Sequence, residues 1–154
     1  MLGAFVEASG WAGYGTPPMG WRLVAIGAFL LAGCVWRSYE RIMTIHLEVL
    51  SGMVNKVVSI ADAGQRPTPN DVTELTYPLE RAQLFLQQFQ SRQREKSYQH
   101  FAAFLARYRD FVAAVDNART DDGRWAGLHA RIHDEAAGLQ AVIEEIRVDL
   151  HPSG

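Results

Sequence analysis

Beyond residue 37 the chain has the polar and apolar periodicity of amphipathic helices. Apolar residues recur there at intervals of three and four, and no stretch alternates long enough to form a strand. Helix-breaking residues gather at 64–70 and 120–123, whereas neither glycine nor proline occurs between Leu79 and Asp122. The pattern therefore predicts an all-helical domain.

The breaks divide this domain into four predicted helices. The first runs from Val35 to Ala63 and ends at Gly64, a residue suited to a helix C-terminus. Its apolar stripe is Ile42, Ile45, Val49, Leu50, Met53, Val57 and Ile60. The second begins at Asn70 or Asp71, beside Pro69, and we expect Pro78 to kink or restart it.

Residues 90–97 carry no apolar side chain, which places a third helix after them with Ser97 as its cap. A single helix over 79–119 would be about 60 Å long, against about 43 Å for the first helix. The last helix spans Asp122–Leu150. We therefore predict an up-down-up-down antiparallel four-helix bundle, with a three-helix bundle containing one long middle helix as the alternative.

Composition excludes several functions. The 154 residues carry 15 Lys and Arg against 17 Asp and Glu, so the chain is not a basic nucleic-acid binder. The single cysteine, Cys34, excludes an internal disulfide, an iron–sulfur cluster and a cysteine-rich zinc site. No nucleophile elbow, phosphate-binding loop, dinucleotide fingerprint or zinc-protease motif is present. We expect no catalytic residues and no enzyme activity.

The most apolar segment, Leu23–Trp36, is 14 residues long and follows Arg22. That length is typical of a signal-peptide core and short for a spanning helix. It contains Leu31-Ala32-Gly33-Cys34, which resembles the lipobox of bacterial lipoproteins. The resemblance implies that Cys34 is diacylated with chains such as palmitate, that the leader is cut before it, and that residues 34–154 form a lipid-anchored domain.

A leader of 33 residues is longer than usual in that family. Met19 opens a segment of ordinary leader proportions, so residues 19–33 are the predicted signal peptide. We then expect translation to begin at Met19 and residues 1–18 to lie outside the native precursor. The alternative is one uncleaved membrane helix over 19–36, with Arg37 and Arg41 holding the domain in the cytoplasm.

Val35 is not the aspartate that, in bacterial lipoproteins, commonly retains the protein at the inner membrane. The resemblance thus favours the outer membrane of a Gram-negative cell, with the domain facing the periplasm. The favoured function is a membrane-tethered binding or interaction module without catalytic activity, whose partners are the membrane and another envelope protein.

Histidines and methionines are the other candidate site residues. His46 falls within the apolar sector of the first helix, together with the thioethers of Met43 and Met53. His129 and His133 have an i, i+4 spacing that can chelate a metal on one helix face. Each also has a simpler structural interpretation. His46 can be a hydrogen-bonded residue at the edge of the core, and the methionines can be packing residues. His129 and His133 can belong to a solvated helix face.

The helix lengths, the proline-containing loop and the aromatic third helix resemble the periplasmic four-helix-bundle cytochromes. That resemblance implies a haem site with Met43 or Met53 opposite His129, His133 or His151, and we add His46 as a candidate cofactor ligand. Covalent haem is not expected, because no Cys-x-x-Cys-His is present. The second functional hypothesis is a periplasmic haem or metal carrier, and the third is a single-span protein with a cytoplasmic helical adaptor domain.

Overall fold

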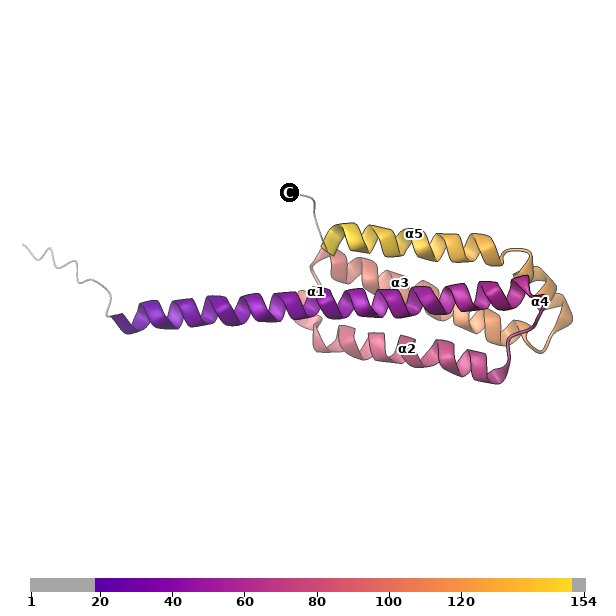
Figure 1. Cartoon of the computed structure of the whole chain (residues 1–154), viewed down its shortest axis with the longest axis horizontal. Helices are drawn as coiled ribbons and strands as arrows, with labels where there is room; N and C mark the ends of the chain where they lie inside the picture. The colour runs from indigo at the N-terminus through magenta and orange to yellow at the C-terminus, as the bar shows by residue number, and fades with distance from the viewer. Residues whose placement is uncertain (1–18, 151–154) are drawn as a thin grey trace, which may run out of the picture. The chain divides into compact units, whose positions relative to one another are not determined.

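The computed structural model describes the backbone of residues 19–150 and the side chains of residues 38–150. The chain divides into two compact units, Met1–Trp36 and Arg37–Gly154. The elements are α1 (Met19–Asp62), α2 (Pro69–Gln88), the short 3-10 turn η1 (Gln90–Arg92), α3 (Lys96–Ala118), α4 (Asp122–His129) and α5 (Ile132–Leu150). The described part is thus an all-helical bundle, as the sequence predicts (Figure 1).

Contacts between successive helices show that their directions alternate. At one end of the bundle the ring of Tyr39 on α1 lies 5.1 Å from that of Phe89, just after α2. At the other end Lys56 of α1 binds Asp71 in the first turn of α2. Helix α3 packs against both α2 and α5, and Lys96 at its start pairs with Asp149 at the end of α5.

Local sequence signals account for the helix ends around the first loop. Gly64 has φ 65°, and the amide of Gln65 donates to the carbonyl of Ile60, which closes the last turn of α1. Thr68 and Asp71 cap α2 reciprocally, each side chain accepting a hydrogen bond from the backbone amide of the other. The predicted glycine terminus is therefore confirmed, and α2 begins at Pro69.

Two helix starts differ from the prediction. Helix α1 starts at Met19 rather than Val35, since no strong breaker separates the apolar segment from the amphipathic one. The chain does break between α2 and α3, but the residue before α3 is Glu95, without a side-chain cap, and Ser97 is buried inside the helix. Pro78 lies inside α2 without ending it.

The predicted last helix is split into α4 and α5. The break falls at Ala130 and Arg131, where no proline stands. Trp125 and Leu128 of α4 are buried, and His129 Nε2 lies 3.1 Å from the carbonyl oxygen of Ala61 at the end of α1. These tertiary contacts turn α4 across the end of the bundle, which local sequence signals do not reveal.

The buried face of α1 is rotated from the predicted one. Leu50 and Val57 are buried as expected, but Ile42, Ile45 and Val49 are exposed. The core positions, an equally regular series, are Tyr39, Met43, Leu47, Leu50, Val54, Val57 and Ala61. This part of the prediction is wrong, because α1 carries two apolar stripes and the other helices cover only one.

The other helices each bury one apolar face in the core. Rings from α1, α2 and α3 form a continuous aromatic core. The centroid of Tyr39 lies 5.5 Å from that of Phe85, and successive centroids from Phe85 through Phe101, Phe104 and Tyr108 to Phe111 are 6.1–6.3 Å apart. The apolar stripe of α3 is buried throughout: Phe101, Phe104, Leu105, Tyr108, Phe111, Val112 and Val115. The rings of this aromatic core are therefore packing residues of the bundle interior.

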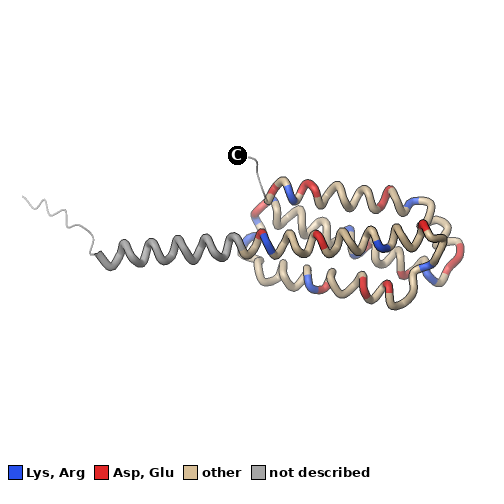
Figure 2. Tube along the Cα trace, viewed as in Figure 1, with Lys and Arg blue, Asp and Glu red and all other residues tan. Residues whose placement is uncertain are grey.

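The surface of the domain carries mixed charge. Figure 2 shows Lys and Arg interspersed with Asp and Glu along the described helices. Between residues 38 and 150 no helix combines the length and the apolar character needed to cross a membrane.

Candidate functional site

An open apolar groove of about 540 Å³ lies between α1 and α2. Its apolar lining comes partly from the α1 residues that the core leaves exposed. Ile45 and Val49 are 49% and 43% exposed, and Tyr77 across the groove is 62% exposed. Ile42, which is 38% exposed, precedes them on the same stripe of α1. The lining residues are Ile45, His46, Val49 and Met53 of α1, and Thr73, Glu74, Tyr77, Pro78 and Arg81 of α2.

These side chains form a contiguous surface, which distinguishes them from scattered surface apolar residues. Single exposed apolar side chains are normal on soluble proteins, whereas contiguous ones mark interaction sites or ligand grooves. The groove runs from Ile45 to Met53 along α1, which is about 12 Å or two helical turns. It is therefore large enough for side chains of a packed partner.

His46 lies at the inner wall of this groove, half-buried against the core. Its ring centroid is 5.2 Å from that of Phe85 and 6.5 Å from that of Phe101. Burial, and secondarily the positive charge of Arg81, lower the pKa of His46 below its ordinary value. At neutral pH the imidazole is therefore uncharged, and it contributes to an apolar wall.

Arg81 supplies the positive charge at this end of the groove. Its guanidinium carbon lies 6.0 Å from the ring centroid of Tyr77, one helical turn away. No carboxylate of the described residues forms an ion pair with it. The groove thus combines an apolar lining with a cation that no carboxylate of residues 38–150 neutralises.

The other end of the groove is closed by a charge cluster. Lys56 of α1 lies 2.8 Å from Asp71 and also pairs with Glu74. Hydrogen bonds from Lys56, and then those from Thr68, lower the pKa of Asp71 to about 2. Lys56 is therefore neutralised by two carboxylates, Asp71 and Glu74. This end of the groove thus presents no free cation to a ligand.

The structure separates the proposed cofactor ligands. His46 and Met53 line the groove, whereas Met43 is fully buried in the core. His129 lies at Ala61, fifteen residues from His46 and so about 22 Å away along α1. The structure therefore does not gather His46, Met53 and His129 around one cofactor.

The predicted histidine pair meets the end of α1. His129 faces the Ala61 carbonyl, and His133 Nε2 lies 2.9 Å from Asp62 Oδ1. The helix break falls between the two histidines, so they do not occupy successive turns of one helix. Among the described residues no three His, Cys, Asp or Glu side chains form a metal-binding group. His151 and the side chain of Cys34 lie outside the described residues.

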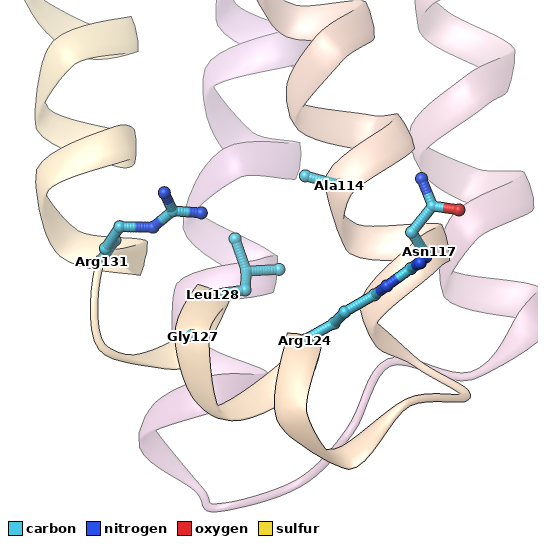
Figure 3. A pocket seen from close by; sticks show the side chains of 6 residues that line it. All are labelled: Ala114, Asn117, Arg124, Gly127, Leu128 and Arg131. Carbon is cyan, nitrogen blue, oxygen red and sulfur yellow. The ribbon is translucent and has the colours of Figure 1, made fainter.

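A second pocket, of about 570 Å³, lies where α4 and the turn that follows it meet α3. In Figure 3, Arg124 extends towards Asn117 while Arg131 lies on the other side of Leu128. Arg124 is already 3.7 Å from Asp121 and mostly exposed. The pocket has a polar, solvated rim and lacks the continuous apolar lining of the α1–α2 groove, which is why we take the groove as the candidate site.

The sequence points to His46 and Met53 but not to the rest of the groove. Its apolar periodicity predicts Ile45 and Val49, together with neighbouring Ile42, in the core, and no pattern indicates Tyr77 or Arg81. The available signal was the second regular stripe on α1, which runs from Tyr39 to Ala61. A helix with two such stripes cannot bury both against the same neighbours.

No protein-family model, curated protein or solved structure matches this chain. The function must therefore be argued from the residues and geometry of the domain.

The His46 environment predicts its titration. Because the folded state disfavours the charged imidazole, we expect a titration midpoint below about 6.5. The neutral His46 ring makes its full contribution to the free energy of unfolding above about pH 6.5. That contribution decreases as the pH falls through the lower pKa of His46 in the folded state. Histidine proton resonances followed by NMR against pH measure this, with His46→Gln providing the assignment.

Arg81→Gln should raise the His46 midpoint part of the way, since burial remains. Arg124→Gln, on α4, is the matched control and should leave it unchanged. A His46 midpoint at or above 6.5 would contradict the burial described here.

Proposed function

We propose that the protein is a membrane-tethered helical interaction module of the bacterial cell envelope, which binds a partner protein through the groove between α1 and α2. The observation that carries the proposal is the exposure of Ile45, Val49 and Tyr77 around an open apolar groove, with exposed Ile42 preceding them on the same stripe of α1. Covering such a surface removes apolar area from water, which is the main driving force of association.

The open shape of the groove favours a protein partner over an enclosed small ligand. Small-molecule sites typically bury most of the ligand surface in a cleft or cavity. An open groove two turns long suits the apolar face of a helix, which presents side chains at i, i+3 or i+4, and i+7. The partner is therefore best sought among helical proteins.

The tether rests on the lipobox resemblance at Leu31–Cys34. Lipid chains on Cys34 would hold the domain at the outer membrane, facing the periplasm, and restrict it to a surface. Confinement raises the effective concentration of tethered partners, so a modest groove can support binding. Without the lipid, a single uncleaved helix over 19–36 would give the same confinement on the cytoplasmic side.

A haem-binding site in the same groove is the second candidate. His46 and Met53 are residue types that ligate haem iron, and both line the groove. A Soret band from the purified full chain, lost in His46→Ala, would select this candidate over the interaction module.

Site-specific photo-crosslinking tests the binding proposal. A photoreactive residue replacing Ile45 in the membrane-bound full chain should yield a defined covalent product, identified by mass spectrometry. The same residue replacing Val148, which is 67% exposed on α5, is the matched control and should yield none. Val49→Asp, which places a charge in the groove, should abolish the product at position 45.

Equal products at positions 45 and 148, or a product unaffected by Val49→Asp, would mean that the groove is not a binding surface. Val49 is 43% exposed, so the substitution should change the free energy of unfolding by no more than about 0.5 kcal/mol. Far-UV circular dichroism of the variant verifies that the helices are intact.

A further inference from the structure

The exposed stripe of α1 has the spacing of a helix-pairing seam. Ile42, Ile45, Val49 and Gly52 follow one another at intervals of three, four and three, which is the a and d pattern of a coiled coil. Gly52 has nothing within 4 Å of the position that a Cβ would occupy, so it leaves room for a neighbouring helix. The stripe therefore has a surface that another helix can pack against closely.

The charges beside this stripe are self-complementary. His46 and Met53 lie on the side of the stripe that faces α2, where Arg81 also lines the groove. Glu48 lies on the other side, about 60° around the helix from Ile45. Glu48 is exposed, and neither it nor Arg81 forms an ion pair with any described residue.

Two-fold symmetry brings these two charges together. Rotation about an axis parallel to α1 places the Glu48 side of one copy against the α2 side of the other. Arg81 lines the same groove as His46. Glu48 lies only two residues, or about 3 Å, further along α1 than His46, so Arg81 and Glu48 lie at similar heights along the helix. Each Arg81 then faces the Glu48 of the second copy, and the pair occurs twice.

We infer that the occupant of the groove is a second copy of this chain, in a parallel and in-register dimer along Ile42, Ile45 and Val49. This inference rests on the proposed function, since attachment near residue 34 holds both α1 helices at the same height and in the same direction. An antiparallel dimer would not satisfy both tethers.

The tether also accounts for the small size of the seam. A standard interface contains about 20–30 residues on each side, whereas this patch has four large apolar side chains. The dimer is therefore weak in solution and forms at the membrane, where tethering raises the effective concentration.

Disulfide trapping in membranes tests the register. In a parallel two-fold dimer the two copies of residue 45 face each other, and a disulfide requires Cα atoms closer than about 7 Å. The full-length Ile45→Cys chain should form a disulfide-linked dimer on mild oxidation of isolated membranes, seen on a non-reducing gel. Val148→Cys is the matched control, and the unsubstituted chain accounts for Cys34; neither should form the dimer.

Charge reversal tests the reciprocal pair. In the Ile45→Cys background, Arg81→Glu or Glu48→Arg should each lower the dimer yield about tenfold, because like charges then face each other twice. The double variant restores opposite charges and should recover the original yield. Both positions are exposed, and circular dichroism verifies each fold.

Two results would overturn the dimer: a yield for Ile45→Cys no higher than for Val148→Cys, or a double variant as weak as the single ones. If position 45 then photo-crosslinks to a different protein, the interaction module stands and only the dimer falls. If position 45 forms neither a self-disulfide nor a specific photo-crosslink, both proposals fall.

Discussion

Phe104→Ala should lower the free energy of unfolding by about 3–5 kcal/mol, the cost typical of removing a buried aromatic side chain. Phe104 is fully buried, and its ring lies between those of Phe101 and Tyr108, with centroids 6.3 and 6.1 Å away. Its truncation leaves a cavity that close-packed helices fill only in part. Chemical denaturation of the purified full chain, followed by circular dichroism, measures the loss.

Leu84→Ala is the matched control for this truncation. Leu84 is 50% exposed on α2, so its truncation should cost no more than about 0.5 kcal/mol. A loss below about 1 kcal/mol for Phe104→Ala would contradict the aromatic core described for α3.

Under the proposed lipidation of Cys34, Cys34→Ser should eliminate lipid labelling and leader removal completely, because a hydroxyl cannot replace the thiol in that acylation. The native chain should incorporate radiolabelled palmitate and have the intact mass of an acylated protein starting at residue 34. The variant should carry no label and retain its leader. The same measurement shows whether residues 1–18 are present in the unprocessed precursor.

Gly33→Ala is the control, since the lipobox accepts either small residue before the cysteine, and it should retain label and processing. An unlabelled native chain that keeps residues 19–33 would instead support the single-span alternative. The helical domain should be unaffected by either substitution, because its described core begins at Tyr39.

Sequence patterns were sufficient to predict a helix end or a buried face where a single local signal was present. Helix α3 carries a single apolar stripe from Phe101 to Val115, so only one face can be buried. Gly64 and the pair of Thr68 and Asp71 end and start helices through bonds within a few residues. Such signals are readable from the chain because their partners are neighbours in sequence.

The site could be predicted only in part, because its residues take their roles from distant contacts. His46 stood out as a polar residue in an apolar sector, and Met53 as a thioether nearby. Ile42, Ile45 and Val49 are chemically ordinary core residues, and Arg81 is an ordinary surface cation. These residues form a groove because α2 lies beside the stripe of Ile42, Ile45 and Val49, whereas the core of the bundle covers the stripe from Tyr39 to Ala61.

Local sequence signals therefore predict the helical class, the end of α1 at Gly64, a break between α2 and α3, and the buried face of α3. Periodicity and capping decide these features locally. Tertiary structure decided which stripe of α1 enters the core, where the last helix breaks, and that an apolar groove stays open beside α2. The physical reason is that two stripes of similar hydrophobicity gain similar free energy on burial, so only packing against the other helices selects between them.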